Sequence, residues 1–172
     1  VEDARRLQKD YYVRYGTTLS GLMIEHDVAP DDFLSHVHDI DVSVLDEDAA
    51  LASAIRALPG KRYIFTNGSV RHAENVLSRI GLDGIFADIF DIRAAGFTPK
   101  PNRIAYERFL LHNGVAPKGA AMFEDLAHNL EAAHDLGMTT VLVASDADWF
   151  SDEPSAKRPA RTGDSHGAHI HH

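Results

Sequence analysis

Residues 61–69 read Lys61-Arg62-Tyr63-Ile64-Phe65-Thr66-Asn67-Gly68-Ser69, and this stretch decides the fold. The apolar run at Arg62–Phe65 has the length of a short strand, and the amphipathic segment Val70–Ile80, closed by Gly81, is typical of a helix. The alternation continues through three more strands and two more helices: Asp88–Ile92, Asn102–His112, Ala120–Phe123, Ala127–Leu136 and Thr139–Val143. This order predicts an α/β protein with a Rossmann-like parallel sheet.

The first 58 residues predict helices and no strand. Their starts and ends place helices at Val1–Tyr15 and Leu19–Asp27, a third opened by Pro30, and a fourth from Asp48. In the fourth helix, Leu51, Ile55 and Leu58 share a face, and in Asn102–His112 we expect four residues to point inward, Ala105, Tyr106, Phe109 and Leu110. We therefore expect a helical segment, residues 1–58, ahead of an α/β core, residues 59–172.

Composition excludes several classes of protein. Lys and Arg total 17 against 26 Asp and Glu, and the formal net charge of -9 argues against binding to a nucleic acid polymer. The chain has no cysteine, which excludes disulfides and cysteine-ligated metals. It has neither an apolar run near the roughly 20 residues of a membrane span nor a signal peptide at its start. We expect a cytoplasmic monomer or homodimer without a membrane partner.

The loop after Phe65 predicts an anion site. In parallel sheets, chemistry lies at the carboxyl ends of the strands, and here a helix N-terminus offers backbone N–H groups and the positive end of its dipole. Thr66 would donate its hydroxyl to a phosphoryl oxygen, while Gly68 would let the backbone come close. The alternative is an ordinary turn in which Ser69 caps the helix.

Two further strand-end loops carry charges. In Thr98-Pro99-Lys100-Pro101-Asn102, the flanking prolines limit the backbone freedom of Lys100. The alternative is an ordinary lysine on the solvated surface. The pair Glu124-Asp125 follows the strand at Ala120–Phe123 and offers the oxygen ligands that Mg²⁺ prefers. Its alternative is a helix-capping Asp125 beside a solvated Glu124.

Threonine, lysine and an acidic pair, each at a strand end and in that order, resemble the second, third and fourth motifs of the haloacid dehalogenase (HAD) superfamily. The resemblance covers nearly the whole chain and is closest to the bacterial pyrimidine 5′-nucleotidase branch. The segments that carry it are Tyr15-Gly16-Thr17-Thr18-Leu19, Thr66-Asn67-Gly68 with His72-Ala73, Lys100-Pro101, and Phe123-Glu124-Asp125-Leu126-Ala127-His128-Asn129-Leu130-Glu131.

This resemblance implies a Mg²⁺-dependent phosphomonoester hydrolase that acts on small nucleoside monophosphates through an aspartyl-phosphate. Thr66 and the backbone at Asn67 and Gly68 would hold the phosphoryl group, and Lys100 would offset its charge. Asp125 and Glu124 would form the metal site, with Asp125 as a ligand of Mg²⁺ and Glu124 nearby or bonding a metal-bound water. Asn129 stands where many relatives have a second acid. Residues 1–58 would form the cap, whose candidates for substrate contact are Tyr12, Arg14, His36 and His38.

The nucleophile of such an enzyme is not found at the expected place. The family begins with an apolar strand ending in Asp-x-Asp, and nothing before Tyr11 fits that pattern. Asp39-Ile40-Asp41 has the acids, but it follows a segment that Pro30 opens like a helix. We therefore expect the nucleophile and its central strand upstream of Val1, and poor stability without them. A homologue that binds phosphate or a partner without turnover stays open as the alternative.

Overall fold

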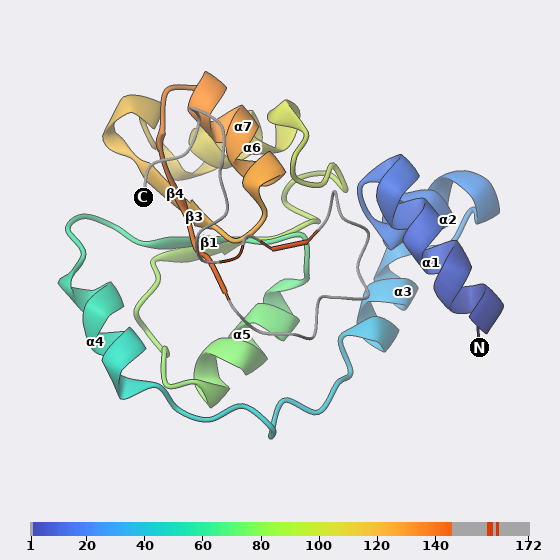
Figure 1. Ribbon diagram of the computed structural model, residues 1–172, viewed down its shortest axis with the longest axis horizontal. Coiled ribbons are helices and arrows are strands. Elements are labelled where there is room, and N and C mark those ends of the chain that lie inside the picture. Colours follow the sequence, from blue (N-terminus) through green and yellow to red (C-terminus); the bar gives the residue numbers. More distant parts are fainter. Residues whose placement is uncertain (1, 146–157, 160, 162–172) are drawn as a thin grey trace. The chain divides into compact units, whose positions relative to one another are not determined.

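The computed structural model describes residues 2–145, 158–159 and 161. Figure 1 shows the elements in chain order. They are α1 (Glu2–Tyr15), α2 (Thr18–His26), α3 (Pro30–Val37), α4 (Ala49–Ala57), β1 (Tyr63–Phe65), α5 (Val70–Arg79), β2 (Asp88–Phe90), α6 (Arg103–Asn113), the 3-10 turn η1 (Pro117–Gly119), β3 (Ala121–Glu124), α7 (Ala127–Asp135) and β4 (Thr139–Leu142). Every predicted element is present, with described boundaries within two residues of those expected.

Side-chain caps explain why the helices begin where they do. Thr17 Oγ1 accepts a hydrogen bond from the N–H of Ser20 at the start of α2. Asp48 accepts one from Leu51 at α4, and Asn102 accepts one from Ile104 at α6. These bonds satisfy N–H groups that have no partner inside a helix, so helix starts could be read from short polar residues in the sequence.

The strands form two parallel pairs. β1 pairs with β2 in the register Tyr63 to Asp88, and β3 pairs with β4 in the register Ala121 to Thr139. Among the described residues, these pairs do not join into one sheet. The α/β class with parallel strands is confirmed.

The chain divides into two compact units. The discontinuous unit contains residues 1–27 and 98–172, and the central unit contains residues 28–97. The predicted boundary after residue 58 coincides with neither junction and falls inside the central unit, between α4 and β1. The reason is packing, since Ala52 on α4 is buried in one cluster with Leu82 and Ile85.

The helices α6 and α4 differ in which residues they bury. In α6, Ala105, Tyr106, Phe109 and Leu110 are all buried, as predicted. In α4, Leu51 and Leu58 are 41% and 40% exposed, while Ala52 is buried. The helix is rotated so that its small residue meets Leu82 and Ile85 and Ile55 lies at the edge of that cluster.

Close packing within the discontinuous unit explains one glycine and one buried hydroxyl. α1 and α2 lie side by side (Figure 1), and a Cβ at Gly21 would come within 2.4 Å of the Tyr11 ring. The Tyr106 hydroxyl donates to the carbonyl oxygen of Asn129 at 2.5 Å and so joins α6 to α7. In the described part of the chain, no helix combines the length and the apolar character that a membrane crossing requires.

Candidate active site

The loop after β1 holds Thr66 in a tight hydroxyl turn. Thr66 Oγ1 accepts a hydrogen bond from the N–H of Gly68 at 2.9 Å, while the N–H of Thr66 donates to the carbonyl oxygen of Phe90. A Cβ at Gly68 would lie 3.2 Å from Thr66 Oγ1 and 3.6 Å from His38 Nε2. Since Thr66 Oγ1 serves as acceptor in this turn, its own proton is available for a ligand oxygen. We call residues 66–69 the Thr66 loop.

The N-terminus of α5 is already partly satisfied by the chain. Ser69 Oγ accepts from the N–H of His72 at 3.3 Å, and the Asp91 carboxylate accepts from the N–H of Val70 at 3.2 Å. The predicted set of free N–H groups at this helix start is therefore smaller than expected. Because the Asp91 carboxylate is itself an anion at the positive end of the helix dipole, Thr66 becomes the main donor that the loop can offer.

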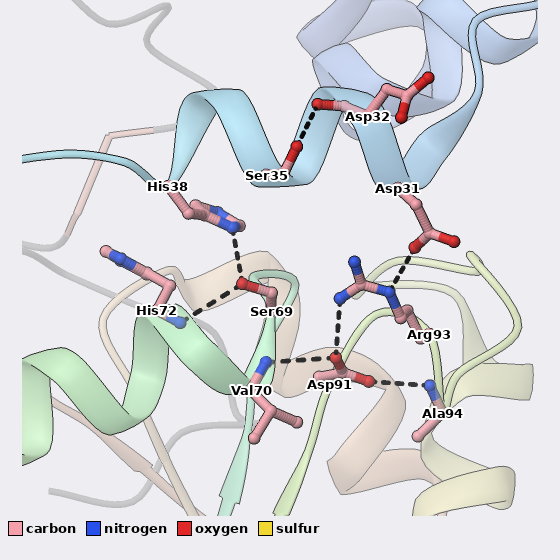
Figure 2. Close-up of polar contacts among 10 residues, drawn as sticks. All are labelled: Asp31, Asp32, Ser35, His38, Ser69, Val70, His72, Asp91, Arg93 and Ala94. Atoms are coloured by element: carbon pink, nitrogen blue, oxygen red, sulfur yellow. Dashed lines mark hydrogen bonds and ion pairs between the residues drawn. The ribbon is translucent and has the colours of Figure 1, made fainter.

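The sequence reasoning missed a polar network around Asp91, which Figure 2 shows. Asp91 is 4% exposed, and its second oxygen accepts from the N–H of Ala94 at 2.9 Å. Arg93 lies 3.7 Å from Asp91 and 2.5 Å from Asp31 on α3. One signal could have found it, since an acid follows β2 directly in an apolar run, and β2 ends beside β1.

His38 is the cap candidate that contacts the Thr66 loop. Its Nδ1 lies 2.8 Å from Ser69 Oγ, and its ring stacks on His72 with centroids 4.6 Å apart (Figure 2). Burial lowers the pKa of His38, and the neighbouring His72 and Arg93 lower it further. The imidazole is therefore held neutral near neutral pH.

Asp39 and Asp41 have no strand to position them. Both are exposed, and they follow the end of α3 in an irregular segment. Asp41 accepts a hydrogen bond from the N–H of Ser43 at 2.8 Å, and hydrogen bonds from the Ser43 side chain and backbone lower the pKa of Asp41. The interpretation that this Asp-x-Asp sequence lies outside a buried strand is confirmed.

Lys100 and Glu124 form a buried ion pair in the discontinuous unit. Lys100 Nζ donates to Glu124 Oε2 at 2.6 Å, with the two side chains only 11% and 7% exposed. Glu124 Oε1 accepts from the N–H groups of Asp125 and Leu126. Burial alone would raise the pKa of Glu124, but the Lys100 charge and these hydrogen bonds hold it below its usual value. The alternatives of a surface lysine and a solvated Glu124 are therefore wrong.

Asp125 is exposed next to this pair. Partial desolvation, then its hydrogen bond with Glu124 and the Glu124 charge, raise the pKa of Asp125 to about 6. Asp125 does not cap α7, because the N-cap residue is Leu126 and no side chain caps it. The helix-capping alternative is therefore wrong, and the Asp125 carboxylate stays accessible to a ligand.

The donor set near Asp125 fits a hard cation. Asn129 is 4% exposed, and its Oδ1 accepts no hydrogen bond from the described residues. A carboxylate and an amide oxygen four residues apart are ligands that Mg²⁺ accepts while keeping several waters. Across residues 2–145, 158–159 and 161, no group of three His, Cys, Asp or Glu side chains could hold a metal ion. The fit is therefore to a metal held by one or two protein ligands.

Arg14 is paired within the first two helices. Its guanidinium contacts Asp10 at 3.0 Å and Glu25 at 3.6 Å, and it lies over the Tyr15 ring.

The predicted site residues form two groups. Thr66, Asn67, Gly68 and His38 belong to the central unit, whereas Arg14, Lys100, Glu124 and Asp125 belong to the discontinuous unit.

A protein-family model matches most of the sequence of this chain. The model of haloacid dehalogenase-like hydrolases matches residues 5–137. The chain belongs to this family. The match spans β1, β3 and the segment between them, which contain Thr66, Lys100 and Glu124-Asp125.

Two curated relatives carry the same name, enolase-phosphatase E1. The chain is 32% identical over 91 residues to the enolase-phosphatase E1 of Xylella fastidiosa (strain M12), a match that covers 51% of this chain and 38% of the relative. It is 30% identical over 152 residues to the enolase-phosphatase E1 of Thioalkalivibrio sulfidiphilus, covering 84% and 62% of the two chains. The chain thus spans less than two thirds of the length of each of these curated relatives.

A solved HAD structure shows the same fold. The L-2-haloacid dehalogenase from Xanthobacter autotrophicus aligns with a TM-score of 0.50 and 25% identity, covering 59% of this chain and 40% of that one. Its name is that of a dehalogenase, whereas the curated relatives are phosphatases. The family is therefore shown at the level of a HAD hydrolase, and the pyrimidine 5′-nucleotidase branch is not among these relatives.

Proposed function

We propose that the protein is a Mg²⁺-dependent phosphomonoester hydrolase. The observation that carries this proposal is the buried Lys100–Glu124 pair beside an exposed Asp125. The pair keeps the Lys100 ammonium next to Glu124 at the end of β3, and it leaves the Asp125 carboxylate accessible. The phosphatase names of the curated relatives support the same chemistry.

The chain's own residues divide the work. Mg²⁺ would supply positive charge for the phosphoryl oxygens, with Asp125 and Asn129 as its protein ligands. In the discontinuous unit, the Lys100 ammonium offsets negative charge, and Glu124 fixes the position of that ammonium. In the central unit, Thr66 donates its hydroxyl to a phosphoryl oxygen while Gly68 keeps the approach open.

The nucleophile would be an aspartate upstream of Val1. Its carboxylate oxygen would attack phosphorus, the bond from phosphorus to the ester oxygen would break, and the second acid of the Asp-x-Asp motif would give its proton to the leaving ester oxygen. Water then cleaves the acyl phosphate, which releases inorganic phosphate and restores the carboxylate. Asp39 and Asp41 lack the buried position that this attack requires.

A small nucleoside monophosphate, such as UMP or CMP, is the substrate that the resemblance to pyrimidine 5′-nucleotidases implies. A different small phosphomonoester is the alternative, and the enolase-phosphatase relatives favour it. Both readings require the same phosphoryl chemistry and differ only in the leaving group.

The test is Mg²⁺-dependent phosphate release from UMP, CMP and an aryl phosphate. The present chain is compared with a form extended upstream by the family's first motif, each with and without Asp125→Ala. The matched control is Asp135→Ala, which removes an exposed carboxylate at the far end of α7. We expect activity in the extended form, lost in Asp125→Ala and kept in Asp135→Ala.

Other outcomes separate the alternatives. Activity in the present chain that disappears with Asp39→Ala would identify Asp39 as the nucleophile. Silence of both forms on every ester would overturn the enzymatic proposal in favour of phosphate or partner binding without turnover. Aryl phosphate turnover without UMP or CMP turnover would keep the phosphatase and reject the nucleotide substrate.

A further inference from the structure

Both ends of α3 are anchored to the loops that follow β1 and β2. At its start, Asp31 pairs with Arg93, and Arg93 also lies beside the buried Asp91. Just beyond its end, His38 contacts Ser69 and stacks on His72 (Figure 2). The His38 ring is thus fixed in position and plane within the central unit.

The hydrogen bonds of Ser69 determine which His38 nitrogen carries the proton. Ser69 is 5% exposed, and its oxygen already accepts from the N–H of His72. A buried hydroxyl proton needs an acceptor, and among the described residues the one in reach is His38 Nδ1 at 2.8 Å. Nδ1 therefore accepts from Ser69, and the proton of the neutral ring is on Nε2.

The Nε2–H group of His38 faces the Thr66 loop. Nε2 lies 3.6 Å from the position that a Cβ at Gly68 would occupy, and Thr66 Oγ1 lies 3.2 Å from that same position. Within the described residues, Nε2 makes no hydrogen bond. The Cβ position at Gly68 is therefore bordered by two donors, the Thr66 hydroxyl and the His38 imidazole N–H, and by His72 Cδ2 at 3.6 Å.

We propose that Ser69 and His72 hold His38 as a neutral Nε2–H donor that binds an oxygen of the phosphoryl ester at the Thr66 loop. Ser69 and His72 are positioning residues in this arrangement, since they act through the His38 ring. The His38 Nε2–H group would be a second neutral donor beside the Thr66 hydroxyl. Such a donor is useful at the start of α5, because the Asp91 carboxylate there already offsets part of the positive end of the helix dipole. The identity of the ligand as a phosphomonoester rests on the proposed function.

The test combines nitrogen NMR of the histidine rings with titration of inorganic phosphate into the chain at neutral pH. We expect the wild-type His38 to show a protonated Nε2 and a bare Nδ1. Phosphate should shift the Nε2–H signal together with the amide signals of Thr66 and Gly68. This readout does not require turnover.

Two substitutions at His38 separate a donor from a structural ring. His38→Gln places an amide N–H near the former Nε2 and should bind phosphate within a few-fold of wild type. His38→Asn places its amide near the former Nδ1, so it should keep the Ser69 contact and bind at least about 10-fold more weakly, as for the loss of a hydrogen bond to a charged group. Equal affinity in the two variants would overturn the proposal.

Ser69 needs a control because it also caps α5. Ser69→Ala should give a mixture of His38 tautomers and weaker phosphate binding. Asp48→Ala removes a cap of the same kind from α4 and should leave both unchanged. A protonated Nδ1 in wild type, or Ser69→Ala behaving like Asp48→Ala, would overturn the inference.

The titration also separates this inference from the proposed function. Phosphate shifts at Thr66 and Gly68 without a shift at His38 Nε2 would overturn the role of His38 and leave the phosphatase proposal in place. The absence of all three shifts would overturn the proposed role of His38 and would also contradict phosphate binding at the Thr66 loop.

Discussion

The Thr66 loop and the Lys100–Glu124 pair follow the same sequence pattern, a strand that ends in polar residues ahead of a helix, yet they are built differently. The Thr66 loop offers a neutral hydroxyl donor and has the imidazole of His38 beside it, and the nearby Asp91 carboxylate is satisfied by backbone N–H groups and Arg93. The Lys100–Glu124 pair instead consists of one buried ammonium and one buried carboxylate. The local sequence pattern therefore predicts where the candidate site residues lie, but it does not predict which interactions hold them in position.

This difference has energetic consequences. A single substitution in the neutral Thr66 loop removes one helix cap or one hydrogen bond, and each contributes about 1 kcal/mol to the free energy of unfolding. A buried charge left without its partner costs several kcal/mol, because it cannot be hydrated. The two places should thus respond very differently to single substitutions.

The largest expected effect is at the buried ion pair. Lys100→Met leaves Glu124 buried and unpaired, and should lower the free energy of unfolding by about 3–5 kcal/mol in urea unfolding. Replacing both partners, Lys100→Met with Glu124→Leu, should restore much of that loss.

The matched control is the exposed pair of Arg103 and Glu107, whose side chains are 53% and 50% exposed. Arg103→Met should cost less than about 1 kcal/mol. A Lys100→Met variant as stable as Arg103→Met would contradict the contrast drawn between the two places.

A smaller effect is expected at the Thr66 loop. Ser69→Ala removes the α5 cap and the buried partner of His38, and should cost about 1–2 kcal/mol in urea unfolding. Asp48→Ala, at the exposed α4 cap, should cost about 0.5–1 kcal/mol. Equal costs would show that the His38 contact adds nothing to the cap.

The surface connection of α3 should matter less. Asp31→Asn removes the exposed partner of Arg93, which keeps Asp91, and should cost about 0.2–1 kcal/mol. Raising the salt concentration should shrink the difference from wild type. A cost as large as that of Lys100→Met would contradict the description of Asp31–Arg93 as a surface ion pair.

The smallest expected effect is a slope with pH. The folded-state pKa of His38 lies below the unfolded value of 6.5, so in that window the unfolded chain binds more protons than the folded one. Its contribution to stability is present above pH 6.5 and is lost as the pH falls through the folded pKa.

His38→Gln should therefore flatten this part of the stability profile. His36→Gln, on the exposed side of α3, is the matched control and should leave the slope unchanged. The check is urea unfolding at a series of pH values from neutral to mildly acidic, and an unchanged slope in His38→Gln would contradict the lowered pKa.

Sequence reasoning located the elements well because helix caps and apolar periods act over a few residues. It proposed that the prolines restrain Lys100, but it could not name Glu124 as the partner, since the two lie 24 positions apart and meet only through folding. Asp91 was missed for the same reason, because the N–H that it caps belongs to another strand-end loop. The shared face of Leu51, Ile55 and Leu58 did not reveal that Ala52 is the buried residue of α4, because period alone does not tell which face finds a partner.

The hydrogen bond from Tyr106 to Asn129 gives the protein an optical marker. Burial, with the charges of Glu124 and Glu131, raises the pKa of Tyr106 far above that of an ordinary tyrosine. Of the 5 tyrosines, Tyr106 should hold its proton after alkali has ionised exposed phenols. Its late ultraviolet signal would then report the moment at which α6 and α7 separate, without any added label.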